Sequence, residues 1–129
     1  SPEQKSPEAD RRKLTRLSMV IKQNKFEELK EALNSIGVSG MTVTQVMGCG
    51  MQKGQTEYYR GAPVPIMLWP KVKGDVVVSA VPVEKVVETA KRVLNTNSIG
   101  DGKIFVYDIE NVIKVRTGEE GFDALQDDK

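Results

Sequence analysis

The segment Gly100-Asp101-Gly102-Lys103 is the part of this chain best suited to binding an anion. It places two glycines around an aspartate and a lysine directly after them. Glycine lacks a Cβ, so backbone N–H groups in such a turn can converge on an anion, and the lysine adds a positive charge at the rim. The segment leads into the apolar residues Ile104 to Val106, which favours a strand. The pattern therefore indicates either a phosphate-binding turn or an ordinary hairpin turn before a strand.

Two further segments carry related chemistry. Residues 48–54 read GCGMQKG and combine spaced glycines with Lys53, while Lys114 and Arg116 stand two positions apart near the end of the chain. Lys114 and Arg116 fit a solvated strand face as well as an anion site. Together with the first segment, these patterns favour the binding of a phosphorylated ligand.

Composition excludes several function classes. The 129 residues fit one domain, and 19 basic against 18 acidic residues leave a net charge of +1, so no global field favours nucleic acid or an anionic membrane. There is no histidine, which removes the usual general base and the commonest metal ligand, so we expect no enzyme. The single cysteine, Cys49, excludes an intrachain disulfide and is interpreted as a small buried residue. No apolar run is long enough for membrane insertion, and we expect a soluble protein.

The elements that position these segments follow a βαββαβ order. Apolar alternation and apolar runs predict strands over 16–22, 41–47, 72–78 and 104–109. Whether residues 112–115 form a short fifth strand is left open. Asn24 and Glu27 predict a capping box at the start of the first helix, which Gly37 ends, and Pro82 begins the second helix. Apolar residues at helical spacing, from Phe26 to Ile36 and from Val83 to Leu94, predict one buried face on each helix. This order predicts an α+β, ferredoxin-like fold, with both helices on one face of an antiparallel sheet.

Residues 1–13 are charged and almost without apolar side chains, which predicts a flexible N-terminal arm before a domain over 14–129. In the domain, the helices leave one face of the sheet uncovered. An uncovered apolar face predicts self-association.

The connection between the second and third predicted strands, about residues 50–70, is longer than a hairpin requires. Its apolar run PVPIMLW over 63–69 either folds back onto the domain or forms an exposed contact surface, and we favour docking to a partner protein. The residues assigned to that surface are Val64, Ile66, Met67, Leu68 and Trp69.

Six segments, in this order and with this spacing, resemble the PII family of nitrogen-signalling proteins. They are Gly40–Thr44, Gln52–Gly54, Tyr59–Ala62, Pro70–Lys73, Thr96 with Ile99–Val106, and Arg116–Glu119. The resemblance extends from about Leu17 to Ala124. It implies a homotrimer with ligand clefts between subunits, in which residues 50–70 form the T-loop that contacts target proteins.

The resemblance implies that ATP or ADP binds between two subunits. Gly100, Asp101, Gly102 and Lys103 would hold the phosphates, Gly50, Met51 and Gln52 would close over them, Val77 would lie beside the nucleoside, and Thr42, Lys114 and Arg116 would complete the site, partly from the neighbouring subunit.

The resemblance also implies Mg²⁺ and 2-oxoglutarate as ligands. The amide oxygen of Gln52 would complete the magnesium shell, since hard oxygen ligands suit that ion. Lys71 would pair with a carboxylate of the oxo-acid, assisted by Lys22. The backbone of Gln52, Lys53 and Gly54 would form an anion nest.

The chain departs from the family pattern at the loop. Met51 stands where the family often has arginine, which removes a cation near the triphosphate and puts the preference for ATP over ADP in doubt. Val64 and Ala62 stand where relatives carry a uridylylated tyrosine and a phosphorylated serine, so neither modification can occur at these positions.

The unmodified loop tip, the N-terminal arm and the start at Ser1 resemble a plastid member after removal of a transit peptide. The implied partner is then N-acetylglutamate kinase or another metabolic enzyme. Two alternatives stay open: a PII-like regulator of a membrane transporter, and a slow ATPase. The absence of histidine argues against the ATPase.

Overall fold

The computed structural model describes residues 12–50, 57–59, 62–64 and 67–126. Its elements follow the predicted order, with an additional pair of short strands and two short 3₁₀ helices. They are β1 (Leu14–Ile21), η1 (Gln23–Lys25), α1 (Phe26–Ser35), β2 (Thr42–Gly50), β3 (Glu57–Tyr59), β4 (Ala62–Val64), β5 (Met67–Val78), α2 (Val83–Leu94), β6 (Lys103–Ile109) and η2 (Gly121–Leu125).

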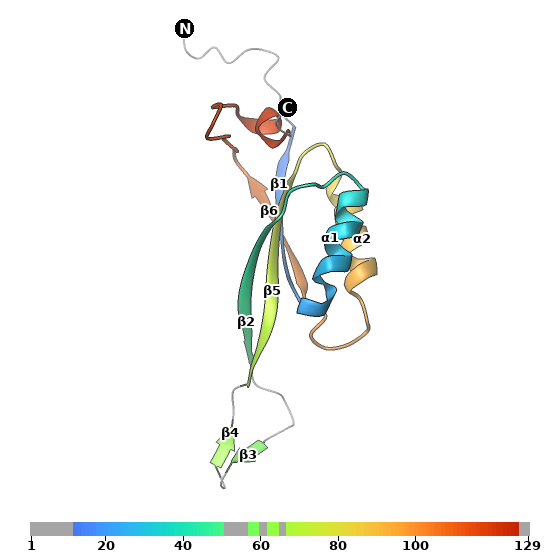
Figure 1. Ribbon diagram of the computed structural model, residues 1–129, viewed down its shortest axis with the longest axis vertical. Helices are drawn as coiled ribbons and strands as arrows, with labels where there is room; N and C mark the ends of the chain where they lie inside the picture. The colour runs from blue at the N-terminus through green and yellow to red at the C-terminus, as the bar shows by residue number, and fades with distance from the viewer. Residues whose placement is uncertain (1–11, 51–56, 60–61, 65–66, 127–129) are drawn as a thin grey trace.

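The main sheet has the strand order β2-β5-β1-β6, and every neighbouring pair is antiparallel. Helices α1 and α2 lie on the same side of this sheet (Figure 1). The predicted ferredoxin-like α+β fold is therefore confirmed. Strands β3 and β4 form a separate two-stranded sheet in the connection between β2 and β5. No helix in the described part of the chain is long and apolar enough to span a membrane.

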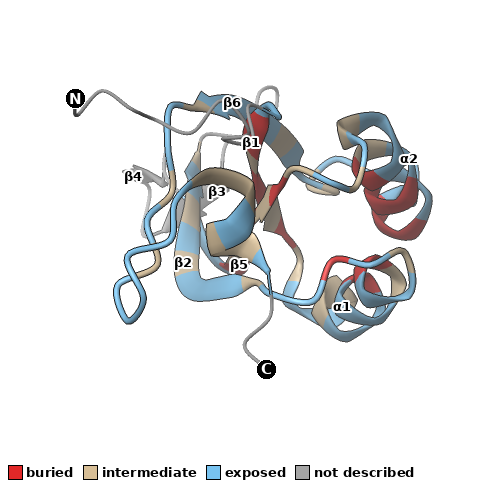
Figure 2. Cartoon of the chain, turned by 90° about the horizontal axis from the view of Figure 1, so that it is seen from above, coloured by how far each residue is buried: buried red, intermediate tan, exposed pale blue. Residues whose placement is uncertain are grey.

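The core lies between the sheet and the two helices. Leu17, Met19 and Ile21 of β1 are fully buried, because alternate residues of a strand point to one face. Leu29 of α1 and Val86 of α2 meet them from the helix side. Figure 2 shows the buried residues of both helices turned toward each other and toward β1. The apolar spacing of the two helices predicted these buried faces correctly.

The two ends of α1 differ in how well the sequence predicted them. The capping box of Asn24 and Glu27 is wrong, because η1 occupies the entry and the N-cap residue is Lys25, with no side-chain cap hydrogen bond. Gly37 ends the helix as predicted, with φ +99°, a conformation that glycine adopts without a Cβ clash.

The strand before Lys71 is longer than predicted. Met67, Leu68 and Trp69 belong to β5 rather than to the loop, and they pair with the end of β2. A Cβ at Gly48 would lie 2.6 Å from Nε1 of Trp69, so the indole lies directly over this glycine. Met67, Leu68 and Trp69 thus lengthen the sheet, and their side chains stay exposed, Leu68 by 63%.

The structure also answers one open point and contradicts one smaller prediction. Residues 112–115 form no strand, because only an isolated bridge joins Ile113 to Glu120 and the chain turns back between them. Cys49 is exposed rather than buried, because it lies where β2 extends beyond the helices.

Candidate functional site

The α2–β6 loop (residues 95–102) is organised by the carboxylate of Asp101. Its Oδ2 accepts hydrogen bonds from the backbone N–H of Thr96 (2.7 Å) and of Ser98 (3.3 Å), and its Oδ1 lies 3.2 Å from Nζ of Lys22. The hydroxyl of Thr96 also donates to this carboxylate. These bonds, those from Thr96 foremost, hold the pKa of Asp101 well below its usual range. The side chain of Asp101 therefore orders the start of the loop by accepting the backbone N–H groups of Thr96 and Ser98.

The two glycines of the loop are required by its geometry. Gly100 has φ +98° and Gly102 has φ +108°, both in the region that L side chains rarely adopt. A Cβ at Gly102 would overlap the carbonyl oxygen of Val20 on β1. The loop thus packs closely against the end of β1, and Lys103 follows it as the first residue of β6.

Lys71 reaches this loop from β5. It is only 7% exposed, and its Nζ donates to the carbonyl oxygen of Gly100 at 2.6 Å. Burial lowers the pKa of Lys71, the nearby charges of Lys22 and Lys103 lower it further, and Asp101 opposes them. Lys22, Lys71 and Lys103, the lysine cluster, thus surround a single carboxylate that already serves the loop. The excess positive charge suits an anionic ligand.

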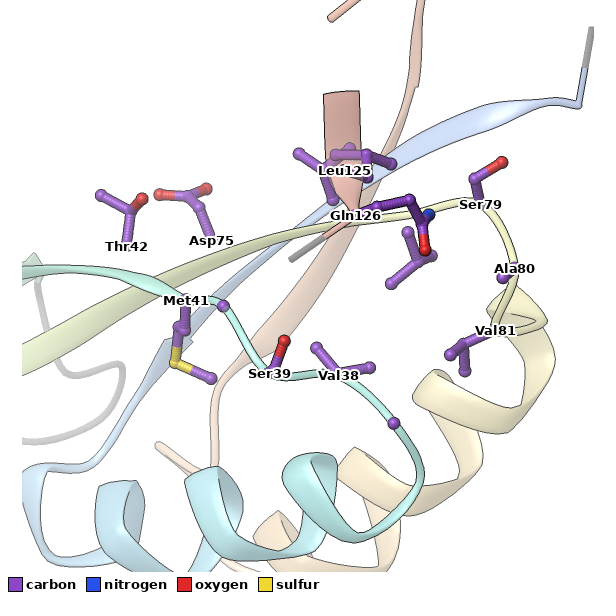
Figure 3. A pocket seen from close by; sticks show the side chains of 14 residues that line it. Val38, Ser39, Met41, Thr42, Asp75, Ser79, Ala80, Val81, Leu125 and Gln126 are labelled. Atoms are coloured by element: carbon purple, nitrogen blue, oxygen red, sulfur yellow. The ribbon is translucent and has the colours of Figure 1, made fainter. Parts of the chain in front are cut away.

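A pocket of about 420 Å³ opens at the start of β2, away from the α2–β6 loop. Thr42 and Val77, two of the predicted nucleotide residues, line it, and Figure 3 shows the side chain of Thr42 beside that of Asp75. Oδ1 of Asp75 and Oγ of Ser79 are buried and lack hydrogen-bond partners among the described residues. Both groups therefore remain available to a ligand in this pocket.

Sequence reasoning missed Asp75 and Ser79. The available signal was the acidic side chain of Asp75 directly before the apolar strand end Val76–Val78. Its significance depends on burial, which the sequence does not state.

The C-terminal segment forms one wall of the same pocket through Leu125 and Gln126. Nζ of Lys114 donates to the carbonyl oxygen of Gln126 at 3.0 Å and lies 3.6 Å from the carboxylate of Glu119. Lys114 is thus brought to the edge of the pocket. Arg116 lies in the same turn and is exposed.

One chain does not bring all predicted nucleotide residues together. Both regions contact β5, but at different places along it: the α2–β6 loop binds Lys71, whereas Asp75, Val77 and Val78 line the pocket. Six residues at about 3.3 Å each, or about 20 Å, separate Lys71 from Val77 along the strand. Thr42, Val77 and Lys114 therefore form one half of the candidate site, whereas Gly100 to Lys103 form the other half with Lys71 and Lys22.

The remaining predicted residues lie at or beyond the end of β2. Gly50 ends β2 and pairs with Met67. Of Val64 only the backbone, in β4, is described. Outside the described residues lie Met51, Gln52, Lys53, Gly54 and Ile66. Within the described part, no group of three or more acidic, cysteine or histidine side chains could hold a metal ion.

Comparison with known sequences gives consistent matches. The family model described as nitrogen regulatory protein P-II matches residues 14–119. A nitrogen regulatory PII-like protein of Bacillus subtilis (strain 168) is 52% identical over 110 residues, which cover 85% of this chain and 95% of the relative. A nitrogen regulatory protein P-II of Pasteurella multocida (strain Pm70) is 46% identical over 112 residues, covering 87% of this chain and the whole relative.

Solved structures agree with the sequence matches. B. subtilis GlnK superposes with a TM-score of 0.75 at 50% identity, covering 87% of this chain and 98% of GlnK. The GlnK–ATP complex superposes with a TM-score of 0.76 at the same identity, covering 87% of this chain and 97% of GlnK. The chain therefore belongs to the nitrogen regulatory protein P-II family, whose members are regulatory proteins rather than enzymes.

Proposed function

We propose that this protein senses an adenine nucleotide together with 2-oxoglutarate and regulates enzymes of nitrogen metabolism through the segment between β2 and β5. The observation that carries the proposal is the pocket lined by Thr42, Val77 and Asp75, in which one carboxylate oxygen of Asp75 is buried without a hydrogen-bond partner among the described residues. The likeness to GlnK, which has been solved in complex with ATP, supports it.

The pocket suits adenine through its buried acceptor. Adenine carries an exocyclic amine, a hydrogen-bond donor, where guanine carries a carbonyl oxygen. Oδ1 of Asp75 can accept from that amine, which would satisfy an otherwise unpaired buried group. A guanine oxygen at the same place would face the carboxylate without a proton between them.

The phosphates would lie at the α2–β6 loop of a neighbouring subunit. The pocket and this loop contact β5 of one chain about 20 Å apart along the strand, so we expect a single nucleotide to reach both across an interface between subunits. Phe105 and Tyr107, on the sheet face away from the helices, are 44% and 43% exposed. A homotrimer, as the family resemblance implies, would cover this face and complete the clefts.

The oxo-acid would bind at the lysine cluster. A carboxylate there would meet the ammonium of Lys71 and that of Lys22, next to the loop proposed for the phosphates. Mg²⁺ on Gln52 and the nest at Gln52, Lys53 and Gly54 are part of the same proposal. Magnesium would join the nucleotide phosphates to the oxo-acid.

The proposed partner is a metabolic enzyme, with N-acetylglutamate kinase as the first to test, and the proposed location is the plastid. The exposed side chain of Leu68, at the base of the β2–β5 connection, supports a contact surface there. Pull-down from extract, with and without ATP and 2-oxoglutarate, tests the partner. A ligand-dependent membrane transporter in place of the kinase would contradict this assignment.

Calorimetric titration of 2-oxoglutarate with Mg-ATP, with Mg-ADP and with no nucleotide tests the sensor itself. We expect tight binding only with Mg-ATP, because ADP lacks the outer phosphate. Thermodynamic linkage requires that 2-oxoglutarate raise the affinity for ATP by the same factor by which ATP raises the affinity for 2-oxoglutarate, with a typical coupling of about 1–3 kcal/mol. Equal binding in all three titrations would contradict the shared magnesium.

A further inference from the structure

One buried lysine ties the α2–β6 loop to the sheet. Nζ of Lys71 and the carbonyl oxygen of Gly100 are 2.6 Å apart, although the two residues are separated by 29 positions in the chain. Lys71 is 7% exposed, and a buried ammonium is costly without a hydrogen-bond partner. The carbonyl of Gly100 supplies that partner, so the bond matters to both groups.

This bond acts on one peptide plane. In a trans peptide the C=O and the following N–H point in opposite directions, so fixing the carbonyl of Gly100 also fixes the N–H of Asp101. That N–H donates to the carbonyl oxygen of Ser98 at 3.3 Å and closes the turn. Lys71 on one side and Ser98 on the other thus hold the same plane.

The other contacts of the loop hold different atoms. The carboxylate of Asp101 binds the backbone of Thr96 and Ser98, at the start of the loop, and Gly102 rests on the backbone of Val20 at its end. Gly100 lies between them, at φ +98°. Lys71 is therefore the side chain that secures the middle of the loop to β5.

We propose that Lys71 is a positioning residue for the α2–β6 loop, which it holds in the conformation that presents Gly102 and Lys103 to phosphate. The nucleotide part of this inference rests on the proposed function, whereas the loop part does not. An ammonium has three donors, so the bond to Gly100 leaves two for the carboxylate of an oxo-acid. An acid bound at Lys71 and a phosphate bound at the loop are then coupled through one side chain, in addition to any bridging metal.

The test compares Lys71→Met with Lys73→Met. Lys73 lies two residues further along β5, on the same face of the strand, and is half-buried, so the control removes an equal charge from the same strand. Two quantities are measured in each protein: amide hydrogen exchange over residues 96–103 without ligand, and ATP affinity without oxo-acid.

In Lys71→Met, we expect exchange about tenfold faster and ATP binding about tenfold weaker, the range for losing one charge-assisted hydrogen bond. Lys73→Met should change neither. Lys71→Arg, which keeps a charged donor, should restore part of both. Thermal unfolding of each variant is measured first, and if Lys71→Met does not fold, Lys71→Gln is judged by the same two quantities.

Unchanged exchange in Lys71→Met, or equal acceleration in Lys73→Met, would overturn the positioning role. Faster exchange with unchanged ATP affinity would support the positioning role and overturn the placement of phosphates at this loop. The two measurements thus separate failure of this inference from failure of the proposed function.

Discussion

The indole of Trp69 lies over Gly48, its cross-strand partner in the β2–β5 pair. Only a residue without a side chain leaves room there, because a Cβ at Gly48 would stand 2.6 Å from Nε1 of Trp69. An aromatic ring placed over a strand glycine covers backbone that would otherwise face solvent.

Gly48→Ala should therefore displace the indole and destabilise the protein by about 1–3 kcal/mol, the usual cost of overpacking. Trp69 is the only tryptophan, so its fluorescence reports the displacement directly. Gly40→Ala is the control, since a Cβ there meets nothing within 4 Å. An unshifted emission spectrum in Gly48→Ala would show that the ring does not occupy this place.

Asp75→Asn should weaken the preference for adenine over guanine. The amide can turn its NH₂ toward the guanine oxygen, whereas the carboxylate only accepts, so ATP affinity should fall about tenfold and GTP affinity should rise. Calorimetry with both nucleotides measures the change. Asp108→Asn is the matched control, since that carboxylate is 80% exposed and pairs with Lys13. If the ratio of ATP affinity to GTP affinity is the same in Asp75→Asn as in the wild type, this carboxylate does not bind adenine.

The stability difference between the wild type and Asp101→Asn should depend on pH. The pKa of Asp101 is lowered by its bonds to Thr96, so the folded state favours the carboxylate. The resulting stabilisation is present above the usual aspartate pKa of about 4 and is lost as the pH falls through the lower folded value. Thermal unfolding from neutral pH to as far below pH 4 as the protein stays folded should show the difference shrinking progressively, and a difference independent of pH would refute this account.

Phe105→Glu should dissociate the proposed trimer, because it places a charge on the sheet face that a second subunit would cover. Light scattering measures the mass. Ile99→Glu changes a residue that is already fully exposed and should leave the mass unchanged. A monomeric wild type that still binds ATP would rule out a site shared between subunits.

Met51→Arg should raise the affinity for ATP more than the affinity for ADP, because the added cation would lie nearest the outer phosphate. Calorimetry on both proteins checks this. Equal gains for the two nucleotides would mean that the side chain at this position points away from the phosphates.

The sequence predicted the features that depend on local pattern. Apolar spacing in α1 and α2, and Gly37 at the end of α1, are properties of neighbouring residues. The capping box failed because an alternative local structure, η1, formed at the same place. The extension of β5 through Trp69 was missed because it depends on pairing with β2, a partner that the local pattern does not identify.

The candidate site shows the same division. The tight turn could be predicted from its glycines, since the positive φ of Gly100 and Gly102 needs residues without a Cβ, whereas the role of Lys103 at a phosphate stays a prediction. The bond from Lys71 to Gly100 and the burial of Asp75 arise only when distant segments pack together. The separation of the site into two halves likewise depends on where the loop and the pocket meet β5, which only the folded sheet shows.

Strand β5 pairs with β1 only from Val72 onward, whereas its pairing with β2 continues to Met67. Beyond Lys71 the sheet is therefore a two-stranded ribbon, and such ribbons twist more readily than wider sheets. Four residues at about 3.3 Å each give this ribbon a reach of about 13 Å. The base of the ribbon lies at Lys71, next to the lysine cluster. A rotation of the ribbon by a few degrees at this base would displace its far end, so ligand binding at the lysine cluster would move the segment that the ribbon carries.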